Sequence, residues 1–296
     1  MTVRETWRVD GTDLAVTVAG DGPLVVLVHG FPDLAITWRL QIATLVAAGY
    51  RVAAPDMRGY GGSERPAESS AYSARVIGRD LIGLLDHEGV ERAHVVGHDW
   101  GAACTWQFGL DYPDRLLSLT GLSVPYVLPP PKAPTEILRA RYGEDFYQLR
   151  FQESETAAEL DRDVLRTLTA AFGDRFEDLG VTAPAATPDW LPNEVLDTYV
   201  AAFKKTGFTS GLAYYRNIDR NWQDAQAREQ RRIECPSLFI TGSSDPVARF
   251  MRVDSSTEAF ADLRVEVIEG AGHWVHQQEP VLVNRLLLTH LGRADY

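Results

Sequence analysis

Residues 94–102 read HVVGHDWGA, and this stretch predicts a buried strand that turns sharply into a helix. Asp99 stands at the centre of the turn Gly97-His98-Asp99-Trp100-Gly101, where a G-x-S-x-G turn would carry a serine nucleophile. The two glycines suit a strained central residue that neighbouring chains crowd. A helix-capping aspartate is the alternative at this position, but the glycines and the strand–helix context favour a nucleophile.

Other short apolar runs end in a polar turn in the same way. They are residues 24–30, 51–59, 116–123, 237–245 and 263–273. Strands buried on both faces have this pattern, which indicates a parallel sheet with helices on either side. Helical patterns lie between the runs at 74–88 and 100–112, and alternating residues at 4–10 and 14–19 predict a hairpin. The predicted fold class is therefore α/β with a mostly parallel sheet.

This alternation of strands and helices stops after Ser123, where five prolines fall between Pro125 and Pro134. From there to about Arg231 only helical periodicity remains, with helices expected at 143–152, 163–172 and 193–205. Strands resume at Ser237, and two sequential domains would leave these late strands without a sheet. We therefore predict a core of residues 1–127 and 231–296 with an all-helical lid of residues 128–230 inserted into it.

The composition excludes several classes of partner. The chain has 296 residues and a formal net charge of -12, which disfavours nucleic acid and anionic membranes. No apolar run is long enough for a membrane span, and the N-terminus has no apolar leader segment. Two distant cysteines, Cys104 and Cys235, provide neither a disulfide framework nor zinc-ligand spacing. We expect reduced thiols and a cytoplasmic location.

A carboxylate at residue 99 has a specific chemistry. It is ionised at neutral pH, so it can attack carbon and form an ester without a base. Hydrolysis of that ester does need a base, and His273 in GAGHWV follows the last predicted strand. Asp245 in TGSSDPV follows the preceding strand and is the expected orienting acid, with Asp254 and Asp262 as weaker rivals. The order nucleophile, acid, histidine is the one known for such turns.

Two backbone N–H groups are expected to stabilise the charge that develops during ester hydrolysis. The turn HGFP follows the first parallel strand and presents the N–H of Phe31, while Trp100 follows the nucleophile. His29 in the same turn is expected to organise the loop, and His98 to pack away from the site.

Several motifs spread over almost the whole chain carry a family resemblance. They are HGFPDLAITWRLQ, PDMRGYGGSERP, VGHDWGA, FYQLRFQE, LAYYRNIDRNW, TGSSDPV and GAGHWV. Together they resemble the epoxide hydrolases of the α/β-hydrolase superfamily, of the soluble type and as a single hydrolase domain.

The resemblance implies that Tyr147 in FYQLRFQE and Tyr215 in LAYYRN are lid phenols that hold the epoxide oxygen. With Phe31 and Trp100 they would line an apolar pocket for a small apolar epoxide, which reacts with water without cofactor or metal. Arg150 departs from the family pattern and is expected to face solvent, and the loop 182–192 matches nothing in it.

Two other functions remain open from the sequence. A haloalkane or haloacid dehalogenase can also use an aspartate nucleophile, and Trp100 could then bind the halide. Haloalkane dehalogenases typically carry an amide at the position of Phe31, and fluoroacetate dehalogenases an arginine at that of Trp100. A non-catalytic ligand-binding member of the fold is the third possibility, although no triad member is missing. The sequence leaves open whether the protein is a monomer or a homodimer.

Overall fold

A computed structural model describes residues 2–179, 186–229, 232–251 and 257–294. Eight strands form one sheet in the order β1-β2-β4-β3-β5-β6-β7-β8. Their bounds are Val3–Val9, Thr12–Ala19, Leu24–Val28, Arg51–Pro55, Ala93–His98, Leu116–Leu122, Ser237–Gly242 and Leu263–Ile268, numbered β1 to β8 in that sequence order. β1 and β2 form an antiparallel hairpin, β2 is antiparallel to β4, and all other neighbours are parallel. The predicted α/β class is confirmed.

One strand differs from the expected pattern. β3 and β5 are buried along their whole length, as their apolar runs predict. β8 alternates between partly exposed and exposed residues, and Val267 is 58% exposed. The expectation that this last strand is buried on both faces is therefore wrong. The reason is its place at the edge of the sheet, where helices cover less of it.

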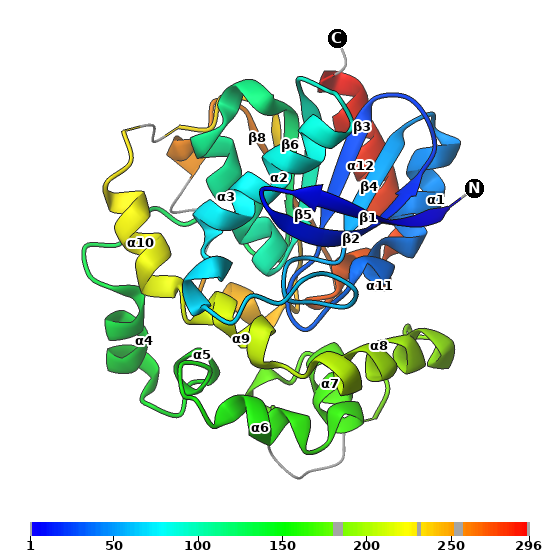
Figure 1. Ribbon diagram of the computed structural model, residues 1–296. Coiled ribbons are helices and arrows are strands. Elements are labelled where there is room, and N and C mark those ends of the chain that lie inside the picture. Colours follow the sequence, from blue (N-terminus) through cyan, green and yellow to red (C-terminus); the bar gives the residue numbers. More distant parts are fainter. Residues whose placement is uncertain (1, 180–185, 230–231, 252–256, 295–296) are drawn as a thin grey trace.

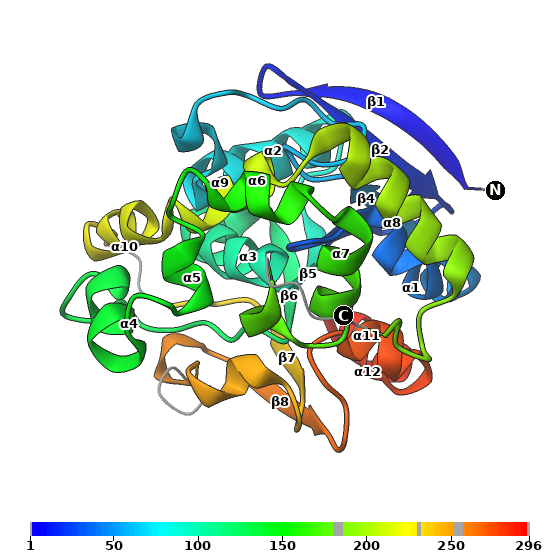
Figure 2. The same ribbon diagram turned by 90° about the horizontal axis from the view of Figure 1, so that it is seen from below.

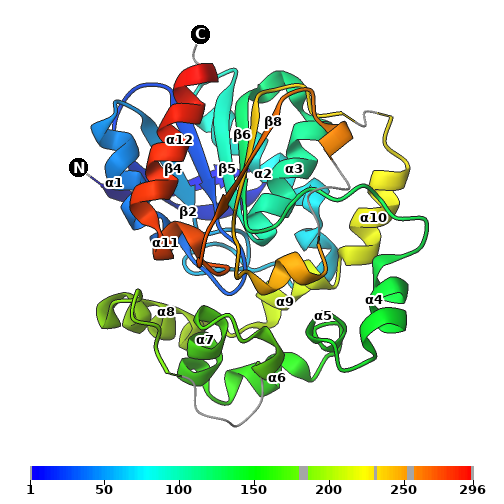
Figure 3. The same ribbon diagram turned by 180° about the vertical axis from the view of Figure 1, so that it is seen from behind.

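Helices cover both faces of the sheet (Figures 1 and 3). α2 (Ala74–His87) and α3 (Trp100–Asp111) pack together on one face, while α1 (Arg39–Ala47), the short α11 (Val275–Gln278) and α12 (Pro280–Ala294) lie on the other. Each layer has its own apolar core. Successive β3 residues alternate between these cores, because neighbouring side chains of a strand point to opposite faces. None of the helices in the described parts of the chain could cross a membrane.

Between β6 and β7 the described chain is helical. The bounds of α4 to α10 are Pro134–Tyr142, Tyr147–Arg150, Thr156–Asp161, Val164–Phe172, Asn193–Thr206, Thr209–Tyr215 and Ile218–Gln226. Short 3-10 turns occur elsewhere in the described chain as well as here, at Ala35–Trp38, Ser69–Tyr72, Pro113–Arg115, Phe176–Asp178, Pro246–Arg249 and Thr257–Ala259. Figure 2, seen from below, shows α4 to α9 spread beneath the sheet as a separate layer.

The expected lid helices agree with the structure except for one. The helix expected at 143–152 is instead α4, which ends at Tyr142, followed by the short α5. Gly143 ends α4 with a φ of 81° and a ψ of 175°, backbone angles that favour glycine and do not continue a helix. The predicted lid limits at residues 128 and 230 stay a proposal, and residues 230 and 231, like part of the loop 182–192, lie outside the described residues.

Gly101→Ala is expected to destabilise the fold, because an added Cβ would lie 2.0 Å from the carbonyl oxygen of Val28. We expect the free energy of unfolding in urea to fall by at least about 2 kcal/mol. Gly292→Ala is the matched control, since its Cβ would meet nothing within 4 Å in α12. That variant should gain about 0.5 kcal/mol. Equal urea midpoints for both variants would contradict the close contact between β3 and α3.

Candidate active site

Asp99 occupies a strained turn between β5 and α3. Its φ is 53° and its ψ is -120°, a conformation that residues with a side chain rarely adopt. A Cβ on Gly97 would lie 2.3 Å from the carbonyl oxygen of Gly101. A Cβ on Gly30 would lie 2.3 Å from Oδ1 of Asp99. The glycines therefore allow the end of β5, the start of α3 and the HGFP turn to meet at the carboxylate, as the sequence pattern requires.

The Asp99 carboxylate is buried and has a partner at each oxygen. The backbone N–H of Phe31 donates to Oδ1 at 2.7 Å, and Nε2 of His273 lies 3.6 Å from Oδ2. Burial alone would raise the pKa of this carboxyl. The neighbouring His273, helped by the hydrogen bond from the Phe31 N–H, outweighs burial and holds the pKa below the usual value of 3.8. Asp99 is therefore an anion over the physiological pH range.

His273 and Asp245 meet on the other side of the nucleophile. Nδ1 of His273 lies 3.2 Å from both carboxylate oxygens of Asp245, which follows β7 and also accepts from the N–H of Val247. Burial disfavours the imidazolium, but the charges and hydrogen bonds of Asp245 and Asp99 raise the pKa of His273 well above 6.5. Of the rival acids, Asp262 is half-exposed and lies 3.6 Å from Arg293, and Asp254 lies outside the described residues.

Three side chains hold the main chain of His273, and the sequence pattern did not identify them for this role. Nε2 of His98 and the hydroxyl of Ser123 donate to its carbonyl oxygen. Its N–H donates to Oδ2 of Asp174, which belongs to the segment between β6 and β7, at 3.1 Å. His98 is buried, as expected, but it supports the base rather than only filling space. The one signal in the sequence was Gly272, which indicates a close approach to the chain before His273. A Cβ there would lie 1.9 Å from Asp174.

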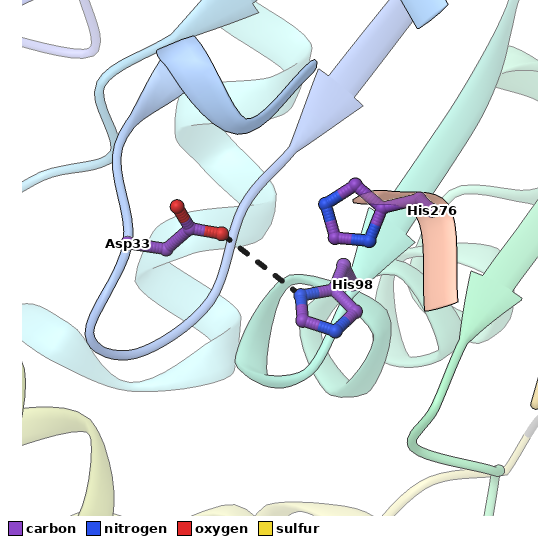
Figure 4. A group of neighbouring side chains, drawn as sticks. All are labelled: Asp33, His98 and His276. Carbon is purple, nitrogen blue, oxygen red and sulfur yellow. Dashed lines mark ion pairs between the residues drawn. The ribbon is translucent and has the colours of Figure 1, made fainter. Parts of the chain in front are cut away.

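One group of described side chains has the composition of a metal site. Asp33, His98 and His276 are buried, and one possible ligand atom from each lies within 4.8 Å of the others (Figure 4). The Asp33–His98 separation is 4.0 Å, wider than the roughly 3.4 Å between ligands that lie 2.0–2.2 Å from zinc. Asp33 accepts a hydrogen bond from Tyr199, and His98 donates to His273. We interpret the group as structural support beneath the base.

Tyr147 in α5 and Tyr215 in α9 face the same cavity as Asp99 and Trp100. Both phenols are buried, and their rings lie 6.3 Å apart. Burial raises the pKa of each above 10.0, and the charge of Asp99 raises it further, so both remain O–H donors at neutral pH. The structure thus brings together four residues that come from three separate segments of the sequence.

The cavity has a volume of about 700 Å³ and extends from Asp99 toward α4 and α10. Phe31 is not among its lining residues, because its ring packs edge-on against Tyr215 at 5.4 Å. Phe31 contacts Asp99 through its backbone N–H, and a substrate contact of its side chain stays a prediction. Lining residues that sequence reasoning missed include Gln107, Ile137, Leu138, Gln148, Asn221, Trp222, Phe250 and Met251. Arg150 does not line the cavity; it is partly exposed and pairs with Glu159.

A carboxylate on a strained strand–helix turn beside a histidine–aspartate pair is the site of an α/β hydrolase. Sequence comparison agrees with this geometry. Residues 23–280 match the family described as alpha/beta hydrolase fold. Epoxide hydrolase A of Mycobacterium tuberculosis is 44% identical over 95% of this chain and 95% of that protein. Epoxide hydrolase 3 of Siraitia grosvenorii is 37% identical over 94% of this chain and 95% of its own length.

Solved structures point to the same group. Epoxide hydrolase A from Mycobacterium thermoresistibile superimposes with a TM-score of 0.94 at 44% identity, covering 98% of both chains. An epoxide hydrolase from Vigna radiata has a TM-score of 0.93 at 32% identity, covering 99% of this chain and 98% of that one. The chain belongs to the epoxide hydrolases of the α/β-hydrolase family.

Asp245→Asn is expected to lower the pKa of His273, because Asp245 is the strongest of the groups that favour the imidazolium. The measurement is an NMR titration of protein with ¹³C-labelled histidine. Asp262→Asn, which removes a half-exposed carboxylate paired with Arg293, is the control and should leave the His273 titration in place. A His273 midpoint that Asp245→Asn leaves unmoved would contradict the assignment of Asp245 as the orienting acid.

Proposed function

We propose that this protein adds water to epoxides and releases vicinal diols through an ester on Asp99. One observation carries the proposal: an ionised carboxylate on a strained turn shares a cavity with two protonated phenols. A nucleophile and acids in one enclosed space are what ring opening needs. The attacking oxygen must be anionic, while the departing oxygen must gain a proton as its bond to carbon breaks.

In the first step, an Asp99 oxygen attacks an epoxide carbon and the carbon–oxygen bond of the ring breaks. Tyr147 and Tyr215 hydrogen bond to the epoxide oxygen, and one phenol gives its proton to the alkoxide as it forms. The Phe31 N–H, 2.7 Å from Oδ1, keeps the carboxylate in a fixed orientation for attack. The product of this step is an alkyl ester of Asp99 and a free hydroxyl on the neighbouring carbon.

In the second step, the His273 imidazolium gives its proton to the phenolate, which restores the phenol. Neutral His273 then takes a proton from water, and the resulting hydroxide attacks the carbonyl carbon of the ester. The backbone N–H groups of Phe31 and Trp100 stabilise the oxyanion. The diol oxygen then leaves with the proton from His273. Asp99 passes the remaining proton to His273, which restores the starting charges, so the sum is epoxide plus water to diol. No step in this scheme needs a metal or a cofactor.

The cavity supports an apolar substrate. Asp99 is the one charged side chain among the described residues that line it, and most of the others are aliphatic or aromatic. An uncharged apolar epoxide fits this chemistry, because a charged substrate would lose its hydration without gaining a partner. A cytoplasmic location remains our proposal, because Cys104 and Cys235 are free cysteines that a reducing compartment would keep as thiols. Residues 128–230 would act as the lid.

Dehalogenation is disfavoured, because two O–H donors of high pKa face the cavity, which suits a departing oxygen that must gain a proton and not a halide ion that leaves without one. The test is a panel of styrene oxide, a stilbene oxide and several haloalkanes, with diol and halide both measured. We expect diol from the epoxides. Halide release without any diol would overturn the proposal, and tight binding without turnover would favour a ligand-binding protein.

His273→Gln should stall after the first step. Ester formation needs only the anion of Asp99, whereas ester hydrolysis loses base assistance worth about 10²–10⁴ in rate. Intact mass spectrometry after mixing with styrene oxide should show the protein heavier by one substrate. Peptide mapping should locate the added mass on Asp99. An inactive variant that never gains mass, although its thermal unfolding matches the wild type, would argue against the two-step scheme.

Tyr147→Phe and Tyr215→Phe should each slow ester formation. Losing one donor to a developing oxyanion costs on the order of 3 kcal/mol, or about a hundredfold in rate. Stopped-flow measurement of the first step isolates this effect from ester hydrolysis. Tyr142→Phe is the control, because that phenol is exposed and does not line the cavity. Wild-type rates in both single variants would place the proton donors elsewhere.

A further inference from the structure

Gln148 follows the first phenol in sequence and lines the same cavity. Its Nε2 lies 2.9 Å from the hydroxyl oxygen of Tyr147, which makes the amide N–H a donor to the phenol. Its own backbone carbonyl accepts from Nε2 of Gln152, which also donates to the carbonyl of Tyr215 at 2.9 Å. Gln152 thus joins α5 to α9, and the two phenol-bearing helices are held to each other beside the amide.

The direction of this hydrogen bond decides where the phenol proton goes. A phenol has one hydrogen to donate and two lone pairs to accept with. The amide N–H occupies a lone pair and cannot accept, so it leaves the Tyr147 hydrogen free. In the described part of the chain, Gln148 is the one hydrogen-bonding partner of this hydroxyl. The other close neighbours of Tyr147 are rings, namely Phe146, Phe151, Phe176, Tyr215 and Phe250. The remaining place for its hydrogen is the cavity.

The same bond makes Tyr147 a better acid. Burial raises the pKa of Tyr147, and the hydrogen bond from Gln148 opposes that rise, because an N–H donor favours the phenolate. Tyr215 has a similar arrangement: its ring meets the Trp100 ring edge-on at 5.0 Å, and a hydrogen bond from the Trp100 side chain lowers its pKa. Each phenol therefore receives an N–H from a cavity-lining neighbour.

We propose that Gln148 is a positioning residue for epoxide opening. Its amide N–H holds the Tyr147 oxygen so that the phenol hydrogen points at the epoxide oxygen. This inference rests on the proposed function and adds to it a residue that determines which way a catalytic donor faces. Gln148 transfers no proton itself and acts through Tyr147.

The test reverses the hydrogen bond. In Gln148→Glu an ionised carboxylate of nearly the same shape can only accept, so it would take the Tyr147 hydrogen and turn it away from the substrate. We expect the single-turnover rate of ester formation at pH 8 to fall about a hundredfold, as when one donor is lost. The rate relative to wild type should recover as the pH falls toward 5 and the introduced carboxyl becomes a donor. Gln148→Leu only removes the hydrogen bond, and its single-turnover rate of ester formation should fall about tenfold.

A double-mutant cycle with Tyr147→Phe separates this role from a general effect of charge. Without the phenol hydroxyl, Gln148→Glu should cause almost no further loss. Gln107→Glu is the matched control, because it adds the same charge to the same cavity from α3. Its effect on the rate should be the same with and without the Tyr147 hydroxyl.

Two results would overturn the inference. One is a loss from Gln148→Glu that is as large in the Tyr147→Phe background as in the wild type. The other is a pH profile of Gln148→Glu that parallels that of the wild type. Both leave the proposed function intact as long as the wild-type protein forms the Asp99 ester and the diol. Failure of the wild type to form either would instead remove the function on which the inference rests.

Discussion

The approach of three chain segments to the Asp99 carboxylate is the constraint on which the rest of the site depends. β5 delivers Asp99 in a strained conformation, with φ at 53°. Close contacts at Gly30 and Gly101 bring the HGFP turn to the carboxylate, where the Phe31 N–H donates to it at 2.7 Å. The strain is held by the buried parallel sheet, since β5 pairs along its length with β3 and β6. The core thus maintains one reactive group in a conformation that is locally unfavourable.

The helices between β6 and β7 complete the site rather than merely covering it. They supply both phenols, and Asp174 from the same segment accepts the N–H of His273 at 3.1 Å. The indole N–H of Trp274 also donates to the carbonyl of Ala171 in α7 at 2.9 Å. The loop that carries the base is therefore bonded to the lid on one side and to His98 on the other. Movement of α7 would therefore disturb the loop that carries His273.

The fold and the charged centre of the site could be predicted from the sequence because both are local patterns. Asp99, Asp245 and His273 each follow an apolar strand, and parallel strands place their ends at one edge. Tyr147 and Tyr215 were found through family resemblance, since aromatic residues in a helix are usually packing residues. Gln148 and Asp174 could not be predicted in these roles. Their partners depend on how the helices sit against the core, and no periodicity records that arrangement.

The charge distribution also explains how the His273 imidazole can be charged before the reaction and neutral when the ester is hydrolysed. Before reaction, the anions of Asp99 and Asp245 both raise the pKa of His273. Ester formation converts Asp99 to a neutral group, so one of the two carboxylates that favour the imidazolium is lost. In the proposed scheme the pKa of His273 then falls and its proton passes to the phenolate left by ring opening, so that the neutral imidazole is available for ester hydrolysis. Asp245 lies 3.2 Å from Nδ1 and holds the ring so that Nε2 faces Asp99. The substrate thus switches the base on by removing the charge that restrained it.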